Sequence, residues 1–216
     1  MTIIRKKTRF SKIKNDFLEK WKNIPPSIAG DCMNRQNIMS ERIKPIIPGR
    51  NLFGQARTVS VVQGDNSAIH AALTLIKKDE ILVVDGGAHL DRAVWGGIMN
   101  FSAEMQKIGG VVIDGSIRDI AEIKNMSLSI YAAGCTPAGP TKGGGGKIDY
   151  PISCGNVNVN AGDIIIGDDD GIAVIPLEQS EELLKLSINR ISMEEKIINK
   201  LKNGIEHKVI FDVKEV

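Results

Sequence analysis

The chain has 216 residues, with 28 Lys and Arg against 26 Asp and Glu, and a formal net charge of +2 at pH 7. This length favours one domain with a substantial core. The balanced charge argues against a dedicated nucleic-acid-binding protein, whose affinity comes mainly from clustered Lys and Arg that face phosphates. Cys32, Cys135 and Cys154 are widely spaced and form no CxxC pair, so neither a disulfide framework nor a zinc ribbon is indicated.

The N-terminus is basic and is predicted to be a solvated, partly disordered arm. Its cations are Arg5, Lys6, Lys7, Arg9, Lys12 and Lys14. No apolar stretch of a leader peptide follows, and no apolar run approaches the ~20 residues that span a bilayer. We therefore expect a cytoplasmic protein that is not embedded in a membrane.

Two helices separated by a proline break are predicted at the start of the chain. Residues 12–23 place Leu18 and Trp21 at helical spacing, and Pro25-Pro26 ends that helix. Ser27 is then predicted to cap a second helix.

The middle of the chain alternates between strand and helix, which is typical of a largely parallel sheet. Asp65 or Asn66 is expected to cap the first of these helices. The predicted strands are 52–63, 81–84, 110–113 and 128–132, and the predicted helices are 68–76, 97–108 and 120–125.

After Ala133 the sequence favours short strands in a mainly antiparallel layer. Strands are predicted at 157–159, 164–166 and 172–175, with turns at 161–163 and 168–171. A long amphipathic helix over 177–201 carries one apolar face, predicted to pack on the body or on a partner subunit.

The segment Asp114-Gly115-Ser116-Ile117-Arg118-Asp119 carries the strongest chemical signal. It follows an apolar strand, and such strands deliver polar residues to a cleft at their carboxyl ends. Arg118 has a planar fork suited to a carboxylate, and Asp119 has hard oxygen ligands for a divalent metal. The alternative is that the pair caps the following helix.

Trp95-Gly96-Gly97-Ile98-Met99 is a second candidate. Two glycines before a helix let backbone N–H groups approach an anion at the positive helix end, although a tight strand-to-helix turn explains the same residues.

Other motifs are interpreted as structural. A P-loop has Ser or Thr after its Lys, whereas Ile148 follows Lys147 here. The segment from Gly143 to Gly146 is therefore predicted to be a flexible loop beside a site. The triplet Asp168 to Asp170 is predicted to be a turn, and Cys154 a structural cysteine.

Five motifs in fixed order make the chain resemble the RraA-like family. The resemblance runs from about Ile28 to Pro176. That family includes class II 4-hydroxy-4-methyl-2-oxoglutarate / 4-carboxy-4-hydroxy-2-oxoadipate aldolases and related oxaloacetate decarboxylases. The motifs are Gly64-Asp65-Asn66, the 85–99 segment, Asp114 to Asp119, Thr136 to Lys142 and Gly167 to Gly171.

The resemblance implies an α/β fold of the swivelling α/β/β sandwich type with a C-terminal amphipathic helix. One RraA-like domain would cover 1–216, with an N-terminal arm and helix at 1–24, a core at 25–177 and a C-terminal helix and tail at 178–216. The family's assembly is a homotrimer or a hexamer built from two trimers, with a site for Mg²⁺ or Mn²⁺ at the subunit boundary.

The resemblance also implies residue roles. Asp119 would ligate the metal, Arg118 would bind the 2-oxo acid and its enolate, and Gly96, Gly97, Ile98 and Met99 would offer backbone amides to the substrate. Glu194 from a neighbouring subunit, with Glu195 adjacent, would complete the metal environment. The implied function is a metal-dependent aldolase or decarboxylase that forms a pyruvate enolate.

Two features bear on this expectation. The aldolases carry an aspartate at the position of Gly97, and glycine can neither hold a water by charge nor remove a proton. The alternative function is that of the RraA proteins that bind and inhibit ribonuclease E without catalysis. Those inhibitors lack the aspartate after the arginine, so the presence of Asp119 in this chain favours a catalytic function over ribonuclease binding alone.

Overall fold

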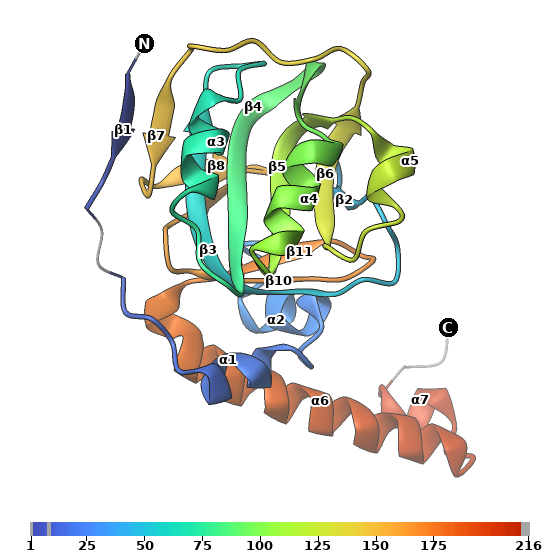
Figure 1. Cartoon of the computed structure of the whole chain (residues 1–216). Helices are drawn as coiled ribbons and strands as arrows, with labels where there is room; N and C mark the ends of the chain where they lie inside the picture. Colours follow the sequence, from blue (N-terminus) through green and yellow to red (C-terminus); the bar gives the residue numbers. More distant parts are fainter. Residues whose placement is uncertain (1, 8–9, 213–216) are drawn as a thin grey trace.

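A mainly parallel sheet forms the middle of the molecule (Figure 1), in a computed structural model that describes residues 2–7 and 10–212. The strands are β1 (Ile3–Arg5), β2 (Lys44–Pro45), β3 (Leu52–Val61), β4 (Glu80–Trp95), β5 (Gly110–Ile117), β6 (Ile130–Cys135), β7 (Gly146–Ile148), β8 (Ile152–Cys154), β9 (Val157–Val159), β10 (Ile164–Gly167) and β11 (Ile172–Ile175). The helices are α1 (Asn15–Trp21), α2 (Pro26–Cys32), α3 (Ser67–Leu73), α4 (Gly97–Met105), α5 (Ile120–Ile123), the 3-10 turn η1 (Leu177–Gln179), α6 (Ser180–Lys202) and α7 (His207–Ile210).

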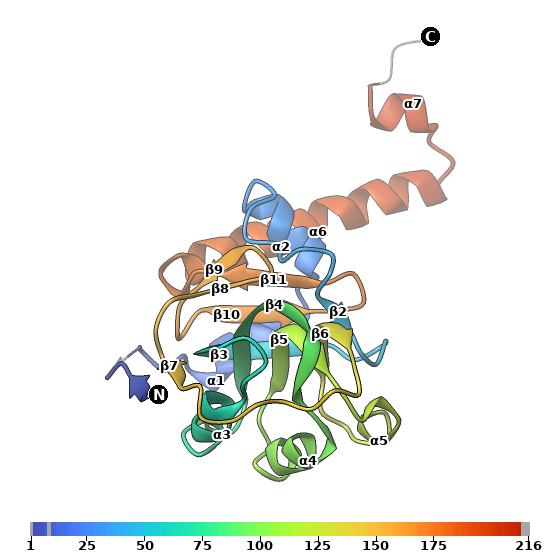
Figure 2. The same cartoon turned by 90° about the horizontal axis from the view of Figure 1, so that it is seen from above.

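Strands β3 to β6 are parallel neighbours, as the alternating pattern predicts. Their connecting helices α3, α4 and α5 all cover one face of the sheet (Figure 2). Strand residues 81–84 are fully buried because helices lie on one face and further strands on the other. This arrangement brings the carboxyl ends of β4 and β5 together at one edge.

The other face of the sheet meets the antiparallel layer that the sequence predicts. Strand β10 pairs antiparallel with β3 and with β11, and β8 pairs antiparallel with β9. One hydrophobic core fills the space between this layer and the central strands, including Val83, Tyr131 and Ile165. A separate core lies between the sheet and α3 to α5. The result is the mixed α/β fold expected, with a long C-terminal helix.

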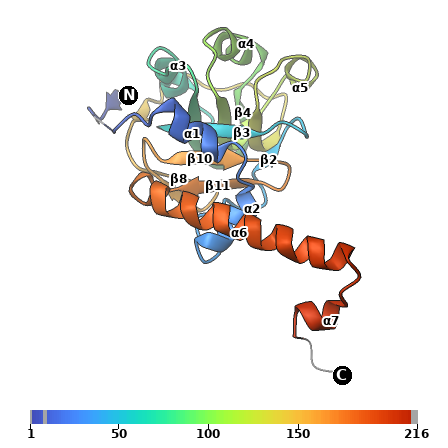
Figure 3. The same cartoon turned by 90° about the horizontal axis from the view of Figure 1, so that it is seen from below.

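Helices α2 and α6 form the outermost layer, on the side of the strands opposite α3 to α5 (Figure 3), and α1 crosses the lower ends of the strands (Figure 1). Trp21, Leu183 and Leu184 are buried there against β10 and β11. Only the first part of α6 packs on the body, because the helix extends beyond it and leaves Ile188 and Ile198 exposed. Within the described residues, no helix is long and apolar enough to cross a bilayer.

Two strands are longer than predicted. Strand β4 was expected to end near residue 84 but continues to Trp95, because it stays paired with β5 across three register irregularities. Strand β5 likewise extends to Ile117. Sequence alone places a loop here because Gly86 and Gly87 follow the apolar run, whereas pairing with a neighbouring strand keeps the backbone extended.

Two predicted caps are also different. Ser27 lies inside α2, which begins at Pro26, since the fixed φ of proline suits the first helical position. At α3, Asn66 is the capping residue but makes no side-chain cap hydrogen bond. Asp65 Oδ1 instead accepts a hydrogen bond from the Ser67 N–H at 2.8 Å.

Part of the basic N-terminal arm forms a short, exposed strand. Ile3 to Arg5 pair in parallel with β7, and Arg5 Nε lies 3.0 Å from Asp149 Oδ2. Arg9 lies outside the described residues.

Candidate functional site

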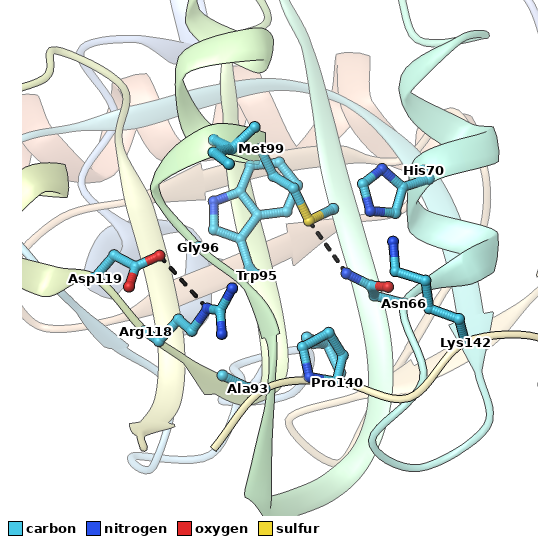
Figure 4. A pocket seen from close by; sticks show the side chains of 13 residues that line it. Asn66, His70, Ala93, Trp95, Gly96, Met99, Arg118, Asp119, Pro140 and Lys142 are labelled. Atoms are coloured by element: carbon cyan, nitrogen blue, oxygen red, sulfur yellow. Dashed lines mark hydrogen bonds and ion pairs between the residues drawn. The ribbon is translucent and has the colours of Figure 1, made fainter. Parts of the chain in front are cut away.

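A pocket of about 480 Å³ opens where β4 ends, β5 ends and α3 and α4 begin. Polar ligands of α/β proteins commonly bind at such an edge. Figure 4 shows two groups of side chains facing each other across it. We call them the proximal wall, formed by Gly96 to Met99 with Arg118 and Asp119, and the distal wall, formed by Asn66, His70 and Lys142.

Arg118 and Asp119 leave β5 in a sharp turn that directs both side chains to the proximal wall. The Arg118 N–H donates to the Trp95 carbonyl at 3.0 Å, and Asp119 adopts the left-handed φ of 62°. Aspartate tolerates this conformation better than most residues, and such local strain concentrates at functional sites. The turn therefore places the pair in the pocket.

The carboxylate of Asp119 faces α4 and does not cap the helix that follows it. Asp119 is the capping residue of α5 but makes no side-chain cap hydrogen bond there. Its Oδ2 accepts the Gly97 N–H at 2.9 Å and lies 3.5 Å from Arg118 Nε. The capping alternative raised by the sequence is thus wrong, because the left-handed turn points the carboxylate back across the pocket.

Gly96 and Gly97 permit this close packing. A Cβ on Gly96 would lie 2.6 Å from Asp119 Oδ2 and 3.1 Å from Arg118 Cγ. A Cβ on Gly97 would collide with the carboxylate of Glu122. A larger residue at either position would therefore require the carboxylate of Asp119 or of Glu122 to move.

The first turn of α4 presents backbone N–H groups to the pocket. The Asn100 N–H donates the first hydrogen bond of α4, to the Gly96 carbonyl at 3.0 Å. The N–H groups of the residues before Asn100 therefore have no acceptor within the helix. The Gly97 N–H is taken by Asp119, which leaves those of Ile98 and Met99 for an anion.

The guanidinium of Arg118 adds a cation to these amides. Its side chain is 42% exposed, and Asp119 is its one ion-pair partner among the residues that the structure describes. The proximal wall can therefore bind a carboxylate through two amides and a guanidinium fork.

The distal wall was given no chemical role by sequence reasoning. Asn66 is 4% exposed and its Nδ2 contacts Met99 Sδ at 3.4 Å, whereas its Oδ1 is buried without a hydrogen-bond partner. Burial and the nearby Lys142 lower the pKa of His70, so its imidazole is neutral at pH 7. The motifs 64–66 and 136–142 were signals for this wall, because both belong to the family resemblance.

The glycine-rich loop beside the site makes hydrogen bonds to the residues around the start of α3, which its sequence did not predict. The Gly143 N–H donates to Ser67 Oγ at 2.7 Å, and the Gly144 N–H donates to Asp65 Oδ2 at 2.9 Å. Hydrogen bonds from Ser67 and Gly144 outweigh the effect of burial and lower the pKa of Asp65, which keeps this carboxylate ionised. The loop is therefore held at the start of α3.

Two structural interpretations are confirmed. The Asp170 N–H bonds to Asp168 Oδ1 at 2.9 Å, so the acidic triplet forms a turn. Cys154 is fully buried, and burial strongly raises the pKa of its thiol.

The donor set for a metal is incomplete within one chain. Among the described residues, no three His, Cys, Asp or Glu side chains gather as a metal site. Asp119 nevertheless fits Mg²⁺, which usually keeps several waters and takes one or two carboxylates together with substrate oxygens. Glu194 is paired with Arg190 at 3.2 Å on α6, across the sheets from α4 (Figure 3). The chain's own Glu194 therefore does not join Asp119.

The fold and the pocket define a mixed α/β protein with a polar pocket at the carboxyl ends of its central strands. The profile of the RraA-like family (Aldolase/RraA) matches residues 26–174. The chain belongs to this family.

Curated relatives carry aldolase names. A Halalkalibacterium halodurans protein provisionally named 4-hydroxy-4-methyl-2-oxoglutarate aldolase is 36% identical over 175 residues, covering 81% of this chain and 83% of that protein. The 4-hydroxy-4-methyl-2-oxoglutarate aldolase of Thermus thermophilus is 33% identical over 129 residues, covering 59% of this chain and 78% of that protein.

A solved structure has the same fold. Streptomyces coelicolor RraAS2, described as an unusual member of the RNase ES inhibitor RraA family, superimposes with a TM-score of 0.81. The match covers 88% of this chain and all of that one at 20% identity, which establishes the fold alone.

Proposed function

We propose that the protein is a divalent-metal-dependent carbon–carbon lyase that acts on 2-oxo acids. The reaction is retro-aldol cleavage of a 4-hydroxy-4-methyl-2-oxoglutarate-type substrate, decarboxylation of oxaloacetate, or both. The observation that carries the proposal is that Arg118, Asp119 and the free amides of α4 face one pocket. The aldolase names of the relatives agree with it.

The chain's own groups suit the charge that such reactions develop. Both reactions leave the enolate of pyruvate. The amides of Ile98 and Met99 hold the substrate carboxylate, and the Arg118 guanidinium offers donors to the oxygen that becomes negative. Asp119 would hold Mg²⁺ or Mn²⁺, and that ion supplies Lewis-acid stabilisation of the enolate when bound.

A neighbouring subunit is part of the proposal. Along α6, Ile188, Met193 and Ile198 are each between 48% and 57% exposed, and the C-terminal part of the helix extends beyond the body of its own chain. A homotrimer, alone or paired as a hexamer, would bury this face and carry Glu194 to another subunit's Asp119.

Gly97 bears on which reaction dominates. It provides no carboxylate to accept a hydroxyl proton, which retro-aldol cleavage requires and decarboxylation does not. Because the carboxylate of Glu122 occupies the space beside Gly97, a loop aspartate would not fit without moving it.

Pyruvate release tests the proposal. The protein is incubated with 4-hydroxy-4-methyl-2-oxoglutarate or oxaloacetate, with Mg²⁺, with Mn²⁺ or with a chelator. We expect metal-dependent pyruvate that is lost in Asp119→Ala and retained in Asp16→Ala, an exposed control on α1. Equal rates in Asp119→Ala and the unaltered protein contradict the proposal.

The second candidate function is ribonuclease binding without catalysis, favoured by the likeness to a Thermus structure described as the RNA-processing inhibitor RraA, which is 27% identical and covers 70% of this chain. Tight ribonuclease association without pyruvate release from either substrate would support it. Both functions are proposed for a cytoplasmic protein.

A further inference from the structure

Glu122 places a second carboxylate beside Asp119, and the function proposed above gives it no role. Helices α4 and α5 lie side by side on one face of the sheet (Figure 2), and Glu122 belongs to the first turn of α5, three residues after Asp119. We propose that Glu122 is a second carboxylate for the divalent cation at Asp119, supplied by the same chain. This inference rests on the metal dependence in the proposed function.

The two acidic side chains meet at Gly97, the first residue of α4. Asp119 Oδ2 accepts the Gly97 N–H at 2.9 Å. A Cβ on Gly97 would lie 3.5 Å from Asp119 Cβ and would collide with Glu122 Oε2. Side chains three residues apart at the start of a helix share one side of it. Both carboxylates therefore approach the same backbone position from α5.

Glu122 lacks a cationic partner. Its side chain is exposed and forms no ion pair with any residue that the structure describes. Within the same described part of the chain, the guanidinium of Arg118 pairs with Asp119 alone, at 3.5 Å. Neighbouring carboxylates disfavour each other's negative charge, and a bound divalent cation offsets this cost because it attracts both.

The positive end of α4 accounts for only one of the two carboxylates. Asp119 takes the Gly97 N–H, whereas Glu122 Oε2 lies where a side chain at residue 97 would begin, a place that offers no hydrogen-bond donor. Mg²⁺ is commonly bound through one or two carboxylates and keeps several waters, and carboxylates also suit Mn²⁺. A carboxylate beside a bound ion can accept hydrogen bonds from those waters. The exposed and unpaired Glu122 suits this role.

Binding of Mn²⁺ tests the proposal without a reaction. Electron paramagnetic resonance measures free Mn²⁺ as the whole protein is added, in a buffer without Mg²⁺. The variant Glu122→Gln keeps the shape of the side chain and removes its charge. We expect it to raise the dissociation constant for Mn²⁺ about tenfold, because loss of an outer partner of a metal site costs about 10–100-fold in affinity. Asp119→Ala should abolish this binding.

The matched control is Glu19→Gln. Glu19 is an exposed glutamate on α1, outside the pocket, and its one printed-sequence neighbour of opposite charge, Lys22, lies 3.9 Å away. This variant should keep the Mn²⁺ affinity of the unaltered protein. Urea unfolding separates a structural role from a metal-binding one, because a structural Glu122 would lower the unfolding midpoint of Glu122→Gln and leave its Mn²⁺ affinity unchanged.

Four results would overturn the proposal: no Mn²⁺ binding by the unaltered protein, unchanged affinity in Glu122→Gln, an equal loss in Glu19→Gln, or binding that survives in Asp119→Ala. Mn²⁺ binding that depends on Glu122 and Asp119 in a protein that releases no pyruvate would support the proposal and refute the lyase. Metal-dependent pyruvate release with unchanged Mn²⁺ affinity in Glu122→Gln would do the reverse.

Discussion

Among the arginines that are paired with carboxylates, Arg57 and Arg118 have opposite roles because of their surroundings. Arg57 is 4% exposed and contacts Glu80 Oε2 at 2.8 Å and Asp149 Oδ1 at 2.8 Å, and those carboxylates are themselves buried. Arg118 is 42% exposed and has one carboxylate partner, at 3.5 Å. The first guanidinium is saturated by the protein, whereas the second keeps donors for a ligand. Burial and partner number separate a structural ion pair from a binding site.

The largest expected effect concerns the buried pair. Arg57→Met leaves the buried Glu80 without its arginine and leaves Asp149 with Arg5, and removal of one member of a buried ion pair costs about 3–5 kcal/mol. Urea unfolding should report this loss. Arg118→Met is the control and should change stability by only about 0.5 kcal/mol, the usual range for surface positions. Equal destabilisation by the two variants would contradict the assignment of Arg57 as structural and Arg118 as a binding residue.

The loss of activity should rank the two arginines in the opposite order, with the larger loss at Arg118. Arg118→Lys keeps the charge but removes the planar fork, and loss of one such donor costs about 10²–10³ in kcat. Steady-state pyruvate release measures this, with the unaltered protein's unfolding midpoint as a check on folding. A variant with full kcat would show that Arg118 is not the group that meets the substrate.

Gly96→Ala perturbs the Arg118–Asp119 pair without changing its charge. The added Cβ would come within 2.6 Å of Asp119 Oδ2, so the carboxylate must move. We expect about a tenfold loss of kcat/KM, since misplacement of a catalytic group by 1 Å can cost about 10²-fold. Gly143→Ala, in open space but at φ 90°, separates local backbone strain from displacement of Asp119. Full activity in Gly96→Ala would contradict the packing argument.

The smallest expected effect concerns Asp65, a buried carboxylate that accepts hydrogen bonds from two backbone N–H groups. Its folded pKa is lowered, so its contribution is complete above the ordinary value of 3.8 and is lost as pH falls through the folded pKa. We expect Asp65→Asn to be about 1 kcal/mol less stable at pH 6. The difference should shrink below pH 3.8. Asp16→Asn serves as the control, and a difference that is constant with pH would refute the assignment.

Much of the fold could be predicted from the chain alone. Apolar strands that alternate with helices specify the parallel sheet, and the later turn residues specify the antiparallel strands. The extension of β4 to Trp95 could not be predicted, because it depends on pairing with β5 and not on local preference.

The candidate site was predictable in part. Arg118, Asp119 and the start of α4 were identified because charged residues and glycines follow apolar strands, and they do line one pocket. Asn66, His70 and Lys142 carried no chemical signal of their own, since Lys142 lies far along the chain from Asn66 and His70 and only the fold brings them together. The hydrogen bonds of the loop at 143–146 were not predicted, because four glycines favour flexibility and the acceptors, Asp65 and Ser67, are distant in sequence.

The order of strands and helices and the residue types at the proximal wall follow from periodicity and turn chemistry, which are local properties of the sequence. Three features depend on the folded chain: the exposure of Arg118, the contact of Asp119 with α4 and the position of Lys142 in the pocket. Burial and partner geometry are set by residues distant in sequence, and they control whether a charge stabilises the fold or remains available to a ligand.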